Sequence, residues 1–140
     1  MSAGIREAIE IAAEAHRDQT DKGGKPYICH SLYVASQQST EDGIIVALLH
    51  DTVEDSPVTL DDLRTAGFSD AVIEALRLLT HQNDVSYSDY ITAIKGNELA
   101  RQVKLADLRH NSDLSRLSKI TEKDLARAEK YLRAIEFLSR

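Results

Sequence analysis

An apolar run that ends abruptly in titratable residues is the feature that most constrains this chain of 140 residues. Residues 44–49 read Ile-Ile-Val-Ala-Leu-Leu, which indicates a buried helix. Residues 50–55 then read His-Asp-Thr-Val-Glu-Asp, so that one imidazole and three carboxylates follow directly. Burying such groups costs free energy unless a metal, an opposite charge or hydrogen bonds compensate. This stretch therefore predicts a site and not only a packing element.

The spacing within this stretch indicates what kind of site it is. On a helix, His50 lies one turn before Glu54, and Asp51 lies one turn before Asp55. That spacing puts two polar pairs on adjoining faces and aims them at one place. We interpret this place as a metal-centred hydrolytic site, for which other parts of the chain must supply the remaining ligands.

The composition fits one soluble globular domain over residues 1–140, with 42% hydrophobic and 29% charged residues. No apolar run approaches the roughly 18 residues that a membrane span needs, and the N-terminus lacks the layout of a signal peptide. A formal charge of −6 argues against broad binding to nucleic acid or to an anionic membrane. The single cysteine, Cys29, excludes an internal disulfide, indicates a cytoplasmic protein and is expected to pack as a small core residue.

Helical periodicity recurs along the chain, and no segment shows the sustained alternation of a strand. We therefore predict an all-α fold, a single-domain bundle of seven to eight helices. The first helices are expected at Ser2 to about Arg17, about Cys29 to Gln38 with Leu32 packed inside, and about Asp42 to Thr52. Polar caps predict where the later helices begin, namely Thr59, Ser69, Ser86 or Ser88, Asn97 and Thr121.

Four residues have the character of ligands for a hard metal, which prefers imidazole and carboxylate groups from several elements. They are His30, His50, Asp51 and Asp107. Taken singly, His30 could be a hydrogen-bonded core histidine, and Asp107 could be an ordinary polar position on an amphipathic helix. His50 and Asp51 are harder to explain in that way, because they follow six apolar residues.

Two further groups of polar residues could serve such a metal. Glu54 and Asp55 could be solvated acids at a helix end, but acids at that end oppose the helix dipole unless a cation or a proton-transfer role stabilises them. Lys104, Asp107, His110 and Asn111 are spaced to share one helix face. That face suits a phosphorylated ligand beside a metal, although Lys104 and His110 could also belong to a surface salt-bridge face.

Three blocks of sequence resemble a known family when they are read in order. The segments at 24–30 (Gly-Lys-Pro-Tyr-Ile-Cys-His), 47–55 (Ala-Leu-Leu-His-Asp-Thr-Val-Glu-Asp) and 103–111 (Val-Lys-Leu-Ala-Asp-Leu-Arg-His-Asn) carry the resemblance. They resemble the HD-domain metal-dependent phosphohydrolases, and more closely the hydrolase domain of the RelA/SpoT family, of the small alarmone hydrolase type. The resemblance extends over nearly the whole chain.

This resemblance implies a helical bundle that binds one manganese ion and removes the 3′-pyrophosphate of guanosine tetra- or pentaphosphate. It implies that His30, His50, Asp51 and Asp107 are the metal ligands, and that Glu54 and Asp55 handle protons. Asn111 and Lys22 match substrate-contacting positions, and we expect Lys104 and Lys25 to offset phosphate charge as well. The chain departs from the family in the loop before His30, where Asp21-Lys22 stands in place of the usual Arg-Lys pair.

The sequence thus predicts a metal-dependent phosphohydrolase whose partner is a small-molecule nucleotide. Two alternatives stay open at this point. The altered loop would favour a different phosphorylated nucleotide or phosphate ester as substrate, and a metal-bearing sensor without turnover belongs to another class. The intact Glu54-Asp55 pair argues against the sensor.

Overall fold

The computed structural model describes residues 3–140 and confirms the all-α prediction. Over these residues the chain forms nine α-helices and one short 3-10 helix, and its only strand-like pairing is an isolated bridge between Thr20 and Pro26. The helices are α1 (Ile5–Ala15), α2 (Ile28–Ser36), α3 (Glu41–Leu49), α4 (Thr52–Asp55), α5 (Leu60–Ala66), α6 (Asp70–Leu79), α7 (Tyr87–Lys95), α8 (Glu98–Asn111), η1 (Leu114–Arg116) and α9 (Glu122–Ser139).

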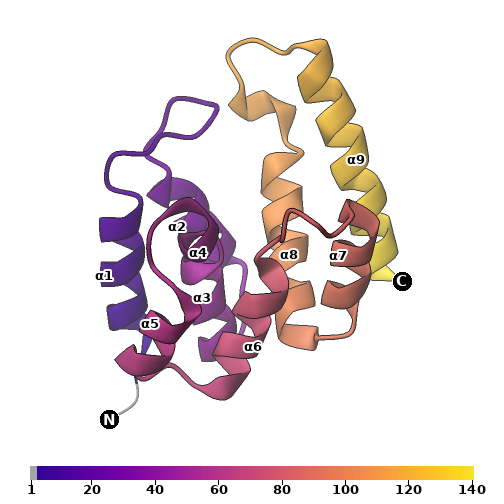
Figure 1. Ribbon diagram of the computed structural model, residues 1–140. Helices are drawn as coiled ribbons and strands as arrows, with labels where there is room; N and C mark the ends of the chain where they lie inside the picture. Colours follow the sequence, from indigo (N-terminus) through magenta and orange to yellow (C-terminus); the bar gives the residue numbers. More distant parts are fainter. Residues whose placement is uncertain (1–2) are drawn as a thin grey trace.

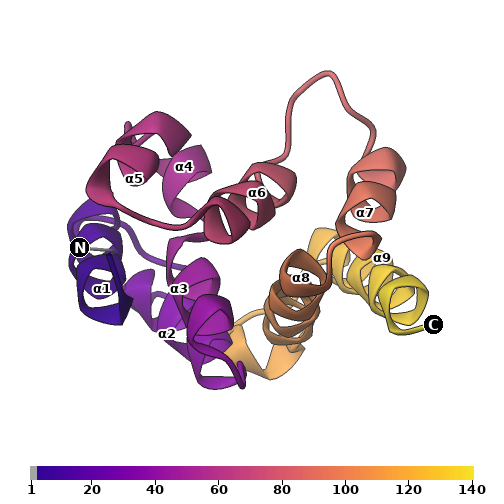
Figure 2. The same cartoon turned by 90° about the horizontal axis from the view of Figure 1, so that it is seen from below.

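The apolar helix of the opening stretch, α3, lies at the centre of the bundle. It packs against α1, α2, α6 and α8, and Figure 2 shows it between these helices. Its residues 45–49 are all buried, and each large side chain among them stabilises the fold by about 1.5–3 kcal/mol. Because the C-terminal half of α3 is buried, His50, which follows it directly, is buried as well.

Polar caps set the helix starts as the sequence predicts. Thr59 and Asp62 form a reciprocal capping box at the start of α5, and Thr121 and Asp124 form another at α9. The side chains of Ser69, Ser86 and Asn97 accept backbone N–H groups at the starts of α6, α7 and α8. Gly67 ends α5 in the left-handed region at φ 105°, which glycine adopts without strain.

Several local predictions were wrong. The helix count is higher than seven to eight because the segment after α3 forms a separate short helix, α4. Cys29 and Leu32 are exposed rather than packed, since α2 turns His30, Ser31, Val34 and Ala35 inward. The predicted start of the first helix at Ser2 lies outside the described residues.

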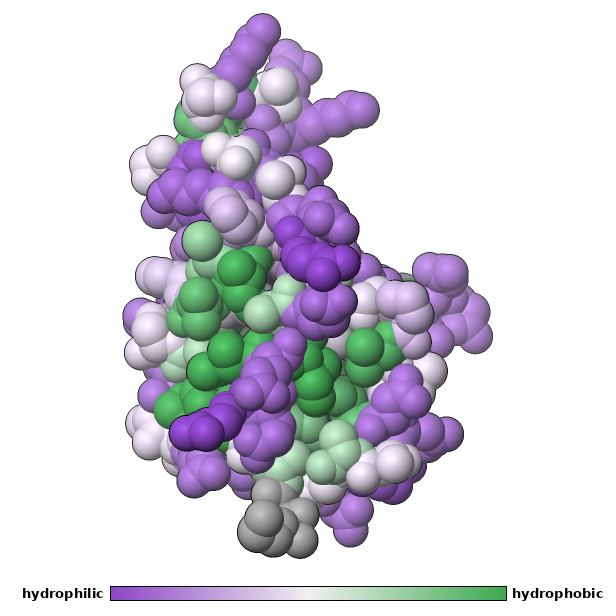
Figure 3. Space-filling model, turned by 90° about the vertical axis from the view of Figure 1, so that its left-hand side faces the viewer, coloured by the Kyte–Doolittle hydropathy of each residue, from purple (hydrophilic) through white to green (hydrophobic). Residues whose placement is uncertain are grey.

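Two segments far apart in the sequence approach each other at one end of the bundle (Figure 1). They are the loop at 16–27, which joins α1 to α2, and the segment at 112–121, which joins α8 to α9. Figure 3 shows that surface apolar groups gather on the lower half of the face that carries α1, whereas the upper half is hydrophilic. Among the described residues, no helix has the length and apolar character to cross a membrane.

Candidate metal centre

The site begins where α3 ends. The helix predicted to continue to Thr52 stops at Leu49, with His50 as its C-cap and Asp51 as the N-cap of α4. Nδ1 of His50 lies 2.5 Å from the Ala47 carbonyl oxygen, so the ring takes an acceptor that the next helical turn would use. The prediction of one continuous helix was therefore wrong, and this break positions His50 and Asp51.

The hydrogen bond to Ala47 also fixes the tautomer of His50. Because a carbonyl oxygen only accepts, Nδ1 must carry the hydrogen, and Nε2 of the neutral ring keeps its lone pair. This Nε2 atom is buried beside the carboxylate oxygens of Asp51 and Asp107, at 3.0 and 3.4 Å, but forms no well-aligned hydrogen bond to either. An orphaned, correctly oriented imidazole nitrogen is what a metal ligand requires.

Four side chains converge at this point from α2, from the α3–α4 junction and from α8. They are His30, His50, Asp51 and Asp107, whose candidate ligand atoms all lie within 4.8 Å of one another. Nε2 of His30 lies 2.8 Å from Oδ1 of Asp107, and Nε2 of His50 lies 3.0 Å from Oδ2 of Asp51. The structure thus brings together all four residues that the sequence singled out.

Neighbouring side chains orient this group. The Tyr27 hydroxyl donates to Oδ2 of Asp51 at 2.5 Å. Nδ1 of His110 lies 2.7 Å from Nδ1 of His30, and the two rings stack. Lys104 and Asn111 donate to the two oxygens of Asp107, which confirms that these three residues share a face of α8.

The charges in the group stabilise one another. Burial alone would raise the pKa of Asp107, but Lys104, His30 and His50 outweigh burial and hold this pKa well below its usual range. Burial would lower the pKa of His50, yet Asp51 and Asp107 raise it well above its ordinary value, so in the metal-free group Nε2 holds a proton that a bound cation would replace. Two carboxylates therefore remain ionised in the interior, where they provide negative charge for a cation.

The acidic pair Glu54 and Asp55 lies at the exposed rim of this group, on α4. Oε1 of Glu54 accepts the backbone N–H of His81, which ties the carboxyl to the end of α6. Partial burial removes water from both carboxyls and raises the pKa of each, and the negative charge of Asp51 raises both pKa values further. The pKa of each acid is therefore closer to neutral pH than that of an ordinary carboxyl, which suits a group that transfers protons.

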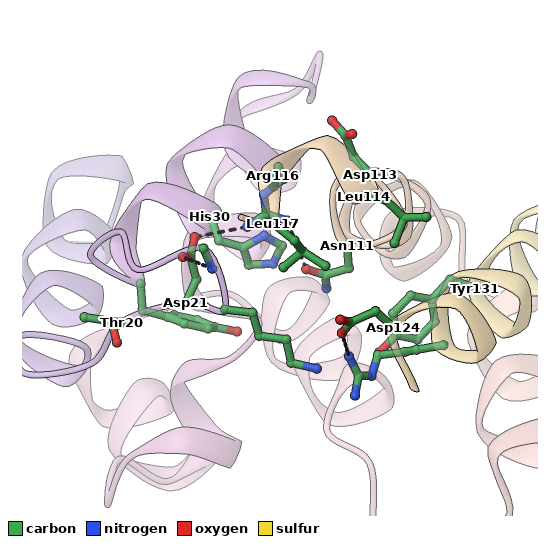
Figure 4. Close-up of a pocket in the computed structure, with 14 residues that line it drawn as sticks. Thr20, Asp21, His30, Asn111, Asp113, Leu114, Arg116, Leu117, Asp124 and Tyr131 are labelled. Carbon is green, nitrogen blue, oxygen red and sulfur yellow. Dashed lines mark hydrogen bonds and ion pairs between the residues drawn. The ribbon is translucent and has the colours of Figure 1, made fainter. Parts of the chain in front are cut away.

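Two cavities flank the group. The larger, of about 300 Å³, extends from His30 and Asn111 towards the two segments that meet at the end of the bundle (Figure 4). The smaller, of about 130 Å³, lies beside Asp107 and is bordered by Glu54, His81 and Lys104. Asn111 and Tyr131 line both cavities, so the two spaces adjoin the same centre.

The residues predicted to contact substrate differ in their positions. Lys22 lines the larger cavity, Lys104 lines the smaller one, and Asn111 lines both. The exposed Lys25 lines neither, and its backbone N–H instead bonds to the carboxylate of Asp21.

Sequence reasoning missed several cavity residues. Arg116, Arg127 and Tyr131 line the larger cavity from the C-terminal part of the chain. Arg127 and Tyr131 are one helical turn apart, which puts them on one face of α9, but nothing in the sequence shows that this face meets the site. Two further histidines contact the rim: the ring of His16 packs at a tilt against the ring of Tyr27, and the backbone N–H of His81 donates to Glu54.

The residues present fit a divalent metal ion. Two imidazoles and two carboxylates form a donor set of mixed nitrogen and oxygen character, and these side chains are at most 17% exposed. Nε2 of His50 lies among carboxylate oxygens without a well-aligned hydrogen bond, an arrangement that a cation shared by the imidazole and the carboxylates would satisfy.

An all-helical bundle with a His/His-Asp/Asp centre defines a class of metal-binding proteins. The family profile described as HD domain matches residues 8–114, and the chain belongs to this family.

Within the family, the chain is similar to the bifunctional (p)ppGpp synthase/hydrolase SpoT of Escherichia coli K12, with 30% identity over 122 residues. That alignment covers 76% of this chain but only 17% of the relative. A guanosine-3′,5′-bis(diphosphate) 3′-pyrophosphohydrolase of Aquifex aeolicus is 36% identical over 87 residues, which are 59% of this chain and 12% of that protein.

A solved structure shares the fold. It was described as a metazoan ortholog of SpoT that hydrolyzes ppGpp and plays a role in starvation responses. The TM-score is 0.81 at 24% identity, and the match covers all of this chain and 87% of the other.

Proposed function

We propose that this protein is a metal-dependent phosphohydrolase that removes the 3′-pyrophosphate from guanosine tetra- or pentaphosphate. The observation that carries the proposal is the convergence of His30, His50, Asp51 and Asp107 within 4.8 Å, beside an acidic pair. The similarity to relatives named as guanosine-3′,5′-bis(diphosphate) 3′-pyrophosphohydrolases supports it.

The metal ligands in this proposal are those four residues, and the metal is manganese, which carboxylate ligands suit. When bound, a divalent ion supplies positive charge beside the scissile phosphate and lowers the pKa of water. Three neighbouring side chains orient the ligands, because Tyr27, His110 and Lys104 each form a hydrogen bond to one of them.

Glu54 and Asp55 carry out the proton transfers. As a water oxygen bonds to the phosphorus atom next to the 3′-oxygen, one of these carboxylates takes the proton of the water. The bond between phosphorus and the 3′-oxygen breaks, the 3′-oxygen takes up a proton, and pyrophosphate leaves. Glu54 is the better placed base, since the N–H of His81 fixes its Oε1 and Glu54, unlike Asp55, borders the cavity beside Asp107.

The substrate lies across the two cavities. The nucleoside occupies the larger cavity, whose volume of about 300 Å³ is at the lower limit of small-molecule sites. Lys22 and Asn111 contact it there, Lys104 offsets charge on the reacting phosphate, and Lys25 contributes from the exposed loop. The reaction takes place in the cytoplasm, where the thiol of Cys29 stays reduced, and residues 1–140 act as one hydrolase domain.

Incubation with guanosine tetraphosphate and Mn²⁺ tests the proposal, with release of pyrophosphate as the readout. The Asp51→Ala variant, which should be inactive, is the control for contaminating activity. Turnover of another phosphorylated nucleotide in place of the alarmone would reject this substrate and keep the phosphohydrolase. The loop before His30 would favour that outcome, since it carries Asp21 where the family usually has arginine.

A further inference from the structure

A groove between α7 and α9 lies outside the candidate metal centre and has no role in the proposed reaction. Both views of the bundle show these two helices side by side near the C-terminus (Figures 1 and 2). The groove has a volume of about 350 Å³, which is at the lower end of the range for small-molecule sites. The residues that line it therefore indicate what it could bind.

The buried part of the lining is apolar. Ile91 on α7 and Ala134 on α9 are at most 6% exposed. The side chains of Tyr87 and Phe137 add two aromatic rings from the same two helices. An apolar body placed against these side chains would leave water, which favours its binding.

The charged part of the lining is cationic. Among the described residues that line the groove, Lys130 and Arg133 are cations and none is an acid. This is unusual in a chain where 23 acidic residues outnumber 17 Lys and Arg residues. The ammonium of Lys130 lies 3.8 Å from the centre of the Tyr87 ring. Arg133 pairs with Glu129 at 2.9 Å, but these side chains are 67% and 71% exposed, so the pair is weak and the guanidinium stays accessible.

Two further cations lie beside the aromatic ring of Phe137. Nζ of Lys95 donates to the carbonyl oxygen of Phe137 at 2.9 Å and lies 4.4 Å from the centre of the ring. The guanidinium of Arg140 lies 5.8 Å from the same centre, and its pair with Glu136 is as long as 4.0 Å. Positive charge therefore surrounds an apolar groove, and Glu136 is not part of its lining.

We propose that this groove binds a small organic anion, with its apolar body against the aromatic rings and its anionic head beside Lys130 and Arg133. Charge complementarity selects an anion, and the buried apolar lining selects a ligand that carries a hydrocarbon body. Tyr87 lines both this groove and the smaller cavity beside Asp107, so an occupant of the groove contacts a residue that borders the catalytic region. The proposal concerns a second site, and binding there can be measured without turnover.

Titration calorimetry with octanoate on the manganese-loaded protein tests the proposal. We expect the double variant Lys130→Gln/Arg133→Gln to bind octanoate about tenfold more weakly, because two exposed charge contacts with the head are lost. Octanol has the same body without the charge and should also bind more weakly than octanoate. The control Lys119→Gln/Lys123→Gln removes the same charge from exposed positions outside the groove and should bind octanoate like the parent.

Thr92→Phe tests the groove in a second way, because it fills the space from an exposed position of α7 and leaves the charge unchanged. We expect this variant to lose octanoate affinity by about tenfold while its melting temperature stays close to that of the parent. Octanoate bound at the metal centre would instead be insensitive to Thr92→Phe and would be lost from the metal-free protein. That pair of results would overturn the proposal.

A titration with 1-naphthoate, which has a flat aromatic body, distinguishes the two kinds of hydrocarbon. Binding of either anion that depends on Lys130 and Arg133 supports the proposal. No binding of either anion, equal affinities for octanoate and octanol, or unchanged affinities in both groove variants would overturn it. A dimer in sedimentation analysis that Thr92→Phe dissociates would also overturn it, since a second copy of the chain would then occupy the groove.

Discussion

Asp21 and Arg116 are 95 residues apart in the chain and form an ion pair of 3.1 Å at the wall of the larger cavity. The other oxygen of Asp21 accepts the N–H groups of Gly23 and Lys25. The Asp21 carboxylate therefore stabilises the turn in the loop between α1 and α2 and also binds this loop to the segment after α8. Lys22 lies within this loop, so the pair also determines where its ammonium group can reach.

Asp21→Asn should lower the free energy of unfolding by about 1.5–3 kcal/mol near pH 7, because hydrogen bonds to a charged group are lost. Burial opposes ionisation of Asp21, but the N–H of Lys25 and the guanidinium of Arg116 outweigh it and lower the pKa below 3.8. A lowered pKa contributes stability above pH 3.8 that is lost as the pH falls through the folded-state value.

Denaturant unfolding of the parent and of Asp21→Asn at several pH values measures this contribution. The difference between the two should be constant well above pH 3.8 and should shrink as the pH falls below 3.8. Glu74→Gln is the control, since its pair with Arg77 is exposed and should contribute little. A difference between the parent and Asp21→Asn that grew as the pH fell below 3.8 would contradict the assignment.

Gly23→Ala should disturb the same loop for a steric reason. A Cβ atom at Gly23 would lie 2.6 Å from the carbonyl oxygen of Arg116, which is backbone and cannot move away cheaply. We expect the variant to lose substrate affinity by about tenfold with a smaller change in kcat, because the loop carries Lys22 and not the reacting groups.

Gly96→Ala is the matched control for that substitution. A Cβ atom there meets its nearest neighbour at 3.6 Å, an ordinary contact. Its backbone is helical, so the added methyl group should be neutral or slightly stabilising. Steady-state kinetics and thermal melts of both variants compare the two sites, and equal behaviour would show that the loop does not press on Arg116.

His50→Ala should abolish metal-dependent stabilisation. Loss of a group that only orients a ligand weakens metal affinity by about 10–100-fold, so loss of a ligand should cost more. Addition of Mn²⁺ should raise the melting temperature of the parent, since a ligand that binds only the folded state stabilises it. The variant should show no such rise, whereas His81→Ala, outside the ligand group, should retain it.

Glu54→Gln should reduce kcat by about 10²–10⁴-fold if Glu54 is the base, with little change in metal content. Burial and the nearby Asp51 raise the pKa of Glu54 above 4.5. The base works in its ionised form, so the rate should fall as the pH falls through this raised pKa, and the acidic limb should lie above pH 4.5.

The pH–rate profile of the parent and of Glu98→Gln, an exposed acid at the start of α8, should share that limb. A fully active Glu54→Gln variant would assign proton transfer to Asp55.

The predictions that held rest on short-range physics. A cap such as Thr59 acts within one turn of its helix, so the residues that satisfy it are visible in the sequence. The ligand set stays a prediction: residue type alone favoured His50 and Asp51, which follow six apolar residues, whereas His30 and Asp107 were assigned by the resemblance of three sequence blocks. The wrong predictions at Cys29 and Leu32 depend on which face of α2 its neighbours cover, and the end of α3 depends on the bond from the His50 ring to the Ala47 carbonyl.

By itself, the sequence determined an all-α chain and the four residues that converge on the candidate metal centre, because periodicity, caps and the burial cost of charge are local properties. Only the tertiary structure decided how these residues meet. The contact of His30 with Asp107 and the pairing of Asp21 with Arg116 both depend on contacts between distant segments. Such contacts follow from the packing of whole helices, which no single stretch of sequence specifies.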